Sequence, residues 1–206
     1  MWIPRRWKCL PVPFPDVGSR GLLCARKRCA MSATALWKIP STWRWVCAAE
    51  ISDVIGGGPP PSHDESNFCP PGKGIAWITP ADLTGYEGAT IKHGRRNLTP
   101  RGLERCGARL MKAGAILLSS RAPIGYCVVA SNPVATNQGF KNFILREGIS
   151  PHFIRYYFRL STQYLHSLAS GTTFPELSGR KAGEIAIPLP PLAEQRRIVA
   201  RLEKLE

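Results

Sequence analysis

A polar, basic stretch in the middle of the chain holds side chains suited to contacting nucleic acid. Arginine and lysine neutralise phosphates, while arginine, asparagine and glutamine can also read base edges through paired hydrogen bonds. A solvated charged surface is the alternative interpretation, because clustered charge does not by itself locate a groove contact. The candidate DNA-binding residues of this stretch are Lys92, His93, Arg95, Arg96 and Asn97.

A second group of candidates lies in loops and at turns between predicted strands. Asparagine and glutamine in such turns often bond to backbone groups and tie loops together, so a structural role remains open for them. The polar loop at 62–74 could determine which DNA sequence is recognised. These positions complete the predicted DNA-contact set with Lys73, Arg121, Asn137, Gln138 and Lys141.

Residue types that catalyse reactions on nucleic acid form no recognisable constellation. The glycines at 56–58 run into three prolines rather than into a helix, so they cannot cradle a phosphate. The Asn-Pro-Val at 132–134 lacks the second proline and the aromatic residue of an amino-methyltransferase motif. Carboxylates are scattered, and the serines and histidines form no nucleophilic arrangement. We therefore predict no catalytic residues; an autonomous nuclease or methyltransferase is the alternative.

The charge of the chain indicates a polyanionic partner. It holds 28 Lys+Arg against 14 Asp+Glu, a net charge of +14, and its pI is about 9.9. Nucleic acid is the first expectation and an acidic membrane surface the second. No apolar run approaches the roughly 18 residues needed to span a bilayer, which excludes an integral membrane protein. A hydrophobic content of 44% excludes disorder of the whole chain.

The seven cysteines are widely spaced and include no Cys-x-x-Cys pair. A zinc site needs four donors, usually from short local spacings, and the four histidines do not complete such a set. The pattern predicts no metal. It also predicts reduced thiols in a cytoplasmic protein, several of them buried as small apolar side chains.

Residues 1–30 differ in composition from the rest of the chain. They hold seven Lys and Arg against one Asp, so +8 of the net charge remains on residues 31–206. They show neither helical nor strand periodicity. Two interpretations are open: sequence upstream of a true start at Met31, which the mixture of Trp, Cys and Pro favours, or a basic nucleic-acid-binding arm.

From Met31 onward the pattern predicts an α/β domain of mixed α+β type. Short runs rich in Ile and Val and bounded by Gly, Pro and Asn are typical of strands. The strongest helix is 151–169, with Ser150 as N-cap and Pro151 in the first turn. Its aromatic stripe is predicted to face the core, and stacking of bases on it is the alternative. Strands are predicted at 75–78, 115–119, 124–130, 142–146 and 184–189, and further helical segments at 47–54, 79–83 and 101–110.

The last stretch leaves a strand through prolines and enters an amphipathic helix. Pro191 suits its first turn, and Glu194 complements the helix dipole. Its apolar seam needs another helix to cover it, since a helix this short is marginal alone. Packing of the helix on its own domain is the alternative. The predicted subunit-interface residues are Leu192, Glu194, Gln195, Ile198, Val199, Leu202 and Leu205.

The tail contains the segment PLPPLAEQRRIV at 188–199. This segment resembles the start of the conserved helical region in the specificity subunits of type I restriction-modification enzymes. Further segments agree in the same order, so that the resemblance covers about residues 36–206. They are IPSTW at 39–43, IAWITPADL at 75–83, GAILLSSRAPIG at 114–125, TNQGF at 136–140 and SGTTF at 170–174.

The resemblance implies both a fold and a function. It implies one globular DNA target recognition domain at 31–189, with a short mixed sheet and flanking helices. The start of a long conserved spacer and dimerisation helix would follow at 190–206. In this family the specificity subunit is not an enzyme: it reads half-sites in double-stranded DNA and docks the modification (methyltransferase) subunits. We therefore expect no cofactor on this chain, with S-adenosylmethionine, ATP and Mg²⁺ bound by partner subunits.

The sequence departs from the family in having one recognition domain rather than two and only the beginning of the helix. We therefore expect a half-length subunit reading one half-site, or else a truncated fragment with only non-specific DNA binding. The expected partners are double-stranded DNA, the modification subunit, the ATP-driven restriction subunit through the complex, and either a second copy of the chain or a second half-subunit.

Overall fold

The computed structural model describes residues 38–171 and 175–205. The residues from Ile39 onward form one compact unit that includes the tail. The basic segment at 1–30, with both of its interpretations, lies outside the described residues.

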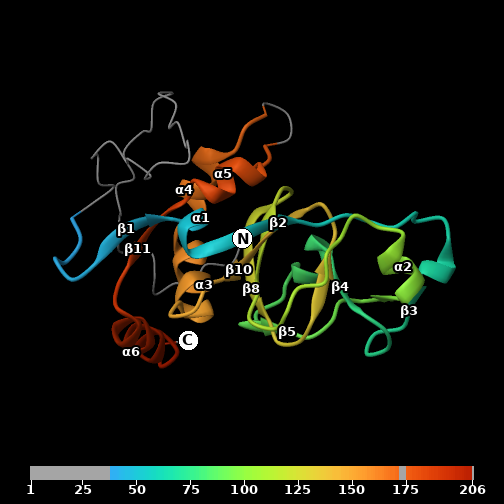
Figure 1. Cartoon of the computed structure of the whole chain (residues 1–206), viewed down its shortest axis with the longest axis horizontal. Helices are drawn as coiled ribbons and strands as arrows, with labels where there is room; N and C mark the ends of the chain where they lie inside the picture. Colours follow the sequence, from blue (N-terminus) through green and yellow to red (C-terminus); the bar gives the residue numbers. More distant parts are fainter. Residues whose placement is uncertain (1–37, 172–174, 206) are drawn as a thin grey trace. The chain divides into compact units, whose positions relative to one another are not determined.

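A five-stranded mixed sheet forms the centre of this unit (Figure 1). Its order is β2-β10-β7-β8-β5, and all neighbours are antiparallel except β5, which is parallel to β8. The strands predicted at 115–119, 124–130 and 142–146 are confirmed as β7, β8 and β10, with small shifts at their ends. The bounds are β2 Ser52–Gly56, β5 Thr90–Ile91, β7 Ile116–Ser120, β8 Ile124–Ala130 and β10 Phe140–Leu145.

The two faces of this sheet bury different partners. Phe143 points to the face covered by α3 (Pro151–Leu160) and α4 (Thr162–Leu168), and its ring centroid lies 5.0 Å from that of Phe158. Phe140 points to the other face, since side chains alternate along a strand. There it packs in a core with residues of a parallel pair, β4 (Ala76–Ile78) and β9 (Val134–Thr136). The sheet is therefore buried on both sides.

The predicted helix at 151–169 is interrupted at Ser161, which separates α3 from α4. Its apolar stripe faces the core as predicted, except that Leu160 is 59% exposed. One tyrosine from each helix bonds to the backbone of Ala186. The Tyr157 hydroxyl donates to the Ala186 carbonyl at 2.6 Å, and the Tyr164 hydroxyl accepts from the Ala186 N–H at 3.1 Å. Burial raises the pKa of both tyrosines, so both hydroxyls stay protonated in this clamp.

A two-stranded sheet joins the beginning and the end of the unit. β1 (Arg44–Cys47) pairs antiparallel with β11 (Ala186–Leu189), which confirms most of the strand predicted at 184–189. The helix predicted at 47–54 is largely wrong: only α1 (Ala48–Ile51) is helical, and β2 follows directly. Pairing of β2 with β10, far away in the sequence, outweighs the local helical pattern. The tail forms α6 (Leu192–Leu202), which packs on α3, and α5 (Gly179–Gly183) lies before β11.

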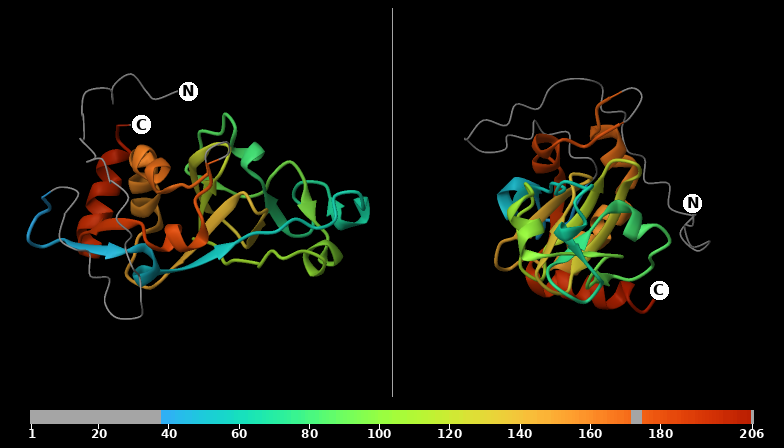
Figure 2. Two further views of the ribbon diagram at one scale, coloured as in Figure 1. Left: turned by 90° about the horizontal axis from the view of Figure 1, so that it is seen from above. Right: turned by 90° about the vertical axis from the view of Figure 1, so that its right-hand side faces the viewer.

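A small lobe lies at the end of the unit farthest from α6 (Figures 1 and 2). It consists of η2 (Glu65–Asn67), β3 (Phe68–Cys69), β6 (Asn97–Leu98) and α2 (Pro100–Glu104), with β3 and β6 paired antiparallel. The helix predicted at 101–110 is therefore shorter than expected. The predicted strand at 75–78 and brief helix at 79–83 are confirmed as β4 and η3 (Pro80–Leu83). Together these elements confirm a mixed α/β domain with a short mixed sheet and flanking helices.

The cysteines only partly follow the expectation of free thiols. Cys69, Cys106 and Cys127 are free, and Cys127 is buried. Cys47 is disulfide-bonded, so the expectation is wrong there. Disulfide pairing depends on distances between Cα atoms in the folded chain, which linear spacing does not show. No described helix combines the length and apolar character required to cross a bilayer.

Candidate nucleic-acid interface

The predicted basic loop connects β5 to β6 and leads into the small lobe. Four of its five candidate residues are exposed: Lys92, His93, Arg95 and Arg96. Asn97 differs from them, because it is only 2% exposed. Its Nδ2 donates to the Lys73 carbonyl at 2.7 Å and thereby ties the turn at 70–74 to β6. The Lys73 side chain itself remains exposed.

Arg95 is held by groups of its own domain. Its backbone N–H donates to Asp82 Oδ1 at 2.9 Å, its Nη2 donates to the Ala81 carbonyl at 3.2 Å, and its Nε lies 3.9 Å from Asp82 Oδ1. Asp82 also accepts from the Thr79 backbone and hydroxyl, which caps η3. The charge of Arg95 is therefore partly neutralised, although its side chain is 76% exposed.

Arg96, the next residue, has a different environment. Its Cζ lies 3.6 Å from the centroid of the Phe68 ring, a cation–π contact. No described carboxylate oxygen lies within 4.0 Å of its nitrogens, so within the described part of the chain its charge has no ionic partner. Phe68 was not among the predicted site residues, although a bulky aromatic inside the polar loop at 62–74 was a usable signal.

Two further arginines of the small lobe share one carboxylate. Asp64 lies 3.7 Å from Arg101 and also forms a close ion pair with Arg105, both of them at α2. The side-chain hydrogen bond from Ser66, followed by that from Arg105, holds the pKa of Asp64 below its ordinary value. This group was not predicted from the sequence, because Asp64 lies about forty residues before the two arginines in the chain.

The second group of candidates is mostly engaged within the domain. Lys141 Nζ lies 3.1 Å from Glu176 Oε1 and 3.3 Å from Ser120 Oγ, and its side chain is only 12% exposed. Arg121 Nη1 lies 3.9 Å from the other oxygen of Glu176. Glu176 thus lies between two predicted DNA-contact cations and reduces the charge that they present to solvent.

The turn between β9 and β10 has a structural asparagine and an exposed glutamine. Asn137 Oδ1 accepts from the Gly139 N–H at 2.9 Å, whereas Gln138 is exposed. This turn packs against η3, because a Cβ added at Gly139 would lie 2.7 Å from Pro80. Arg95 bonds to the same short helix, so the basic loop and the β9–β10 turn both contact η3.

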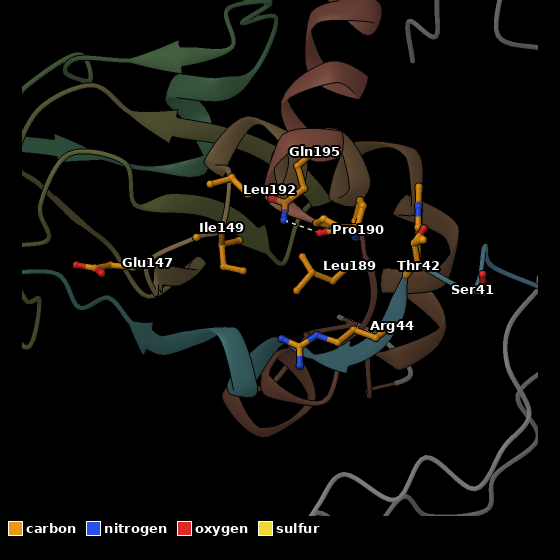
Figure 3. A pocket seen from close by; sticks show the side chains of 12 residues that line it. Ser41, Thr42, Arg44, Glu147, Ile149, Leu189, Pro190, Leu192 and Gln195 are labelled. Atoms are coloured by element: carbon orange, nitrogen blue, oxygen red, sulfur yellow. Dashed lines mark hydrogen bonds between the residues drawn. The ribbon is translucent and has the colours of Figure 1, made fainter.

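One face of the tail helix packs on its own domain. Gln195 is 1% exposed; its Nε2 donates to the Pro190 carbonyl at 2.9 Å, and its Oε1 accepts from the Ser150 N–H at 2.8 Å (Figure 3). Val199 is 8% exposed. Packing on α3 thus buries two of the predicted interface residues within their own domain. Leu192, Glu194, Ile198 and Leu202 are half-buried, and Leu205 is 48% exposed.

A cavity of about 460 Å³ lies beside the start of α6. Its lining comes from the segments at 41–44, 147–149 and 189–192 together with Gln195 (Figure 3). Arg44 and Glu147 extend from different sides of it in Figure 3. Across residues 38–171 and 175–205, no three His, Cys, Asp or Glu side chains gather as metal ligands.

The fold and the basic surface agree with a class of DNA-specificity proteins. Residues 40–206 match the family described as the type I restriction modification DNA specificity domain, and the chain belongs to this family. The resemblance stated from the sequence motifs is thereby confirmed.

Known relatives support the same assignment. The type I restriction enzyme MjaIX specificity subunit of Methanocaldococcus jannaschii is 40% identical over 171 residues, covering 82% of this chain and 39% of that protein. A solved structure described as the basis of complex assembly and conformational transition of the type I R-M system aligns with a TM-score of 0.66 and 29% identity, over 82% of this chain and 39% of the other.

The crystal structure of the HsdS subunit from Thermoanaerobacter tengcongensis aligns with a TM-score of 0.62 and 27% identity. It covers 82% of this chain and 38% of that one. The chain therefore spans about two fifths of the length of these relatives.

Proposed function

We propose that this chain is a non-catalytic specificity subunit that reads one half-site of duplex DNA in a type I restriction-modification system. The family match over 40–206 carries the proposal. The exposed cations Lys92, Arg95 and Arg96 beside the small lobe support it, because they provide a surface for the phosphate backbone and base edges. Methylation and cleavage would belong to partner subunits, which would bind S-adenosylmethionine, ATP and Mg²⁺.

The DNA part of the proposal predicts a steep dependence on salt. Each phosphate neutralised contributes about −0.9 to the slope of log affinity against log salt concentration. We expect the affinity of the full chain for duplex DNA to fall markedly between about 50 and 200 mM salt. An affinity that stays constant over this range would contradict the proposal.

A pair of double variants tests the location of the contact. Replacing Arg95 and Arg96 by Ala should flatten the salt slope by about 1 to 2. The matched control replaces Arg180 and Arg197 by Ala and so removes the same formal charge. These two arginines lie on other helices, where they pair with Glu184 and Glu194. Equal slopes for the two variants would remove the basic loop from the interface.

The second part of the proposal is that α6 docks the modification subunit. Ile198 and Leu202 are four residues apart and share one face of α6, and the exposed Leu205 lies in the turn that follows the helix. Leu205→Asp should weaken assembly with a modification subunit in sedimentation experiments, whereas Ala200→Asp, an exposed position on another face, should not. Normal assembly of the Leu205→Asp variant would leave α6 as a packed terminal helix only.

A further inference from the structure

The strand pair β3–β6 places Arg96 on the same face as Phe68. Phe68 pairs with Leu98 and Cys69 with Asn97, so Arg96, two residues before Leu98, is a diagonal neighbour of Phe68. Long side chains reach across such diagonals. The stacking at 3.6 Å is therefore a consequence of the strand register.

The backbone beneath this stack is firmly held. Ile75 and Leu98 exchange two backbone hydrogen bonds of 2.8 and 2.9 Å, and the Asn97 amide is anchored to the turn at 70–74. Asn67, which precedes Phe68, is 0% exposed and donates from Nδ2 to the Pro61 carbonyl at 3.0 Å. The ring of Phe68 thus projects from a fixed frame, which reduces the conformational entropy that Arg96 would lose on binding.

A hollow of about 260 Å³ lies next to the stacked pair. It is lined by Glu65, Phe68, Cys69, Pro70 and Arg96. The guanidinium therefore borders a recess that has an apolar wall and a carboxylate. A carboxylate at this position disfavours a phosphate and can accept from the amino group of cytosine, while arginine pairs with O6 and N7 of guanine.

We infer that Arg96, stacked on Phe68, is a specificity-determining residue that reads a guanine of a G·C pair in the major groove. Glu65 is the acceptor for the paired cytosine. The inference rests on the proposed DNA-reading function and assigns base readout to one side chain. Arg95 is the natural contrast, because its side chain is already held by Asp82 and the Ala81 carbonyl.

The test is selection of bound sequences from a randomised duplex pool by the full chain and its variants. Wild type should enrich a motif that contains a G·C pair. Arg96→Ala should lose the preference at that one pair and bind the wild-type motif about 5- to 100-fold more weakly. Arg96→Lys should lose the same preference while keeping the salt slope, because lysine keeps the charge but not the planar fork.

Two further variants separate base readout from charge and folding. Phe68→Leu keeps apolar bulk in the lobe but removes the ring. It should weaken the preference at the same base pair, by a smaller factor than Arg96→Ala does. Arg95→Ala should leave the motif unchanged. Melting temperatures of the variants close to that of wild type would show that the lobe is folded.

The outcomes distinguish failure of the inference from failure of the proposed function. If wild type enriches a motif and Arg96→Ala enriches the same one, or weakens all sequences equally with a flatter salt slope, Arg96 contacts phosphate only and the inference is overturned. If wild type enriches no motif, both the inference and the proposed recognition of a half-site fail.

Discussion

The central sheet and the small lobe are stabilised by different means. The core between the sheet and the β4–β9 pair contains a large set of buried apolar side chains, among them Ile78, Leu117 and Phe140. The core that the small lobe shares with the β4–β9 pair has three buried members: Leu98 from the lobe, and Trp77 and Ala135 from β4 and β9. The lobe compensates with polar ties through Asn67, Asn97 and Asp64.

This difference separates a scaffold from a candidate reading surface. Apolar burial gives the sheet its stability without needing a particular polar arrangement. Hydrogen bonds have definite directions and therefore fix where Phe68 and Arg96 lie. A small lobe held by such bonds can present side chains to DNA while the sheet maintains the fold.

The largest expected effect is in the scaffold. Phe143→Ala removes a ring that is 1% exposed and packs on Phe158, so the free energy of unfolding should fall by about 3–5 kcal/mol. Chemical denaturation would measure it. Leu160→Ala, at a side chain that is 59% exposed, is the control and should change stability by at most about 0.5 kcal/mol. Similar losses for both variants would refute the assignment of the core.

The next effect is specific to the lobe. Gly102 lies in α2, where alanine would ordinarily be more favourable by about 1 kcal/mol. Here an added Cβ would lie 2.1 Å from the Asn67 carbonyl oxygen, so Gly102→Ala should instead destabilise by about 1–3 kcal/mol. Thermal denaturation together with DNA binding would measure the loss. Gly179→Ala is the control, because a Cβ added at Gly179 has no atom within 4 Å. An equal change in stability for the two variants would show that the lobe adjusts to the added Cβ at little cost.

A smaller effect is expected at the corner around Glu176. Glu176→Gln removes the partner of Lys141 and Arg121, and stability should fall by about 1 kcal/mol or less, because Glu176 is partly exposed. The salt slope of DNA binding should stay unchanged, since Lys141 is largely enclosed. Titration of binding against salt would measure this. A steeper slope would show that this corner also reaches the phosphate backbone.

The smallest effect concerns thiol chemistry. Burial raises the pKa of Cys127 to about 12, so its thiol stays protonated in the folded protein. Stability from this protonated form is fully present below the ordinary thiol pKa near 9.0 and decreases as the pH rises toward 12. At pH 8, alkylation followed by peptide mass spectrometry should label Cys69 and Cys106 but spare Cys127. Rapid labelling of Cys127 without denaturant would contradict its burial.

Much of the fold was predictable because its signals are local. The strands β7, β8 and β10 come from apolar runs between turn residues, and the start of α3 comes from Ser150 and Pro151. The errors occurred where distant residues decide the local structure. Pairing of β2 with β10 replaced the helix predicted at 47–54, and packing on α3 buried Gln195 and Val199 of the tail.

The sequence was enough to predict a charged loop at the candidate site, but not the different environments of its residues. Arg95 and Arg96 are equivalent in composition, yet one bonds to Asp82 and the other stacks on Phe68. Neither partner is a near neighbour of its arginine in the sequence. Asn97 matched the chemistry of base reading and is nevertheless buried.

The sequence by itself determined the family, the mixed α/β class and the positive charge, because ordered motifs, periodicity and composition are properties of the chain. The tertiary structure alone decided which cations are engaged within the domain and which are not. Whether a guanidinium or an ammonium group is free depends on which carboxylates, rings and carbonyls lie within a few ångströms, and Asp82, Asp64 and Glu176 reach their cations only through the fold.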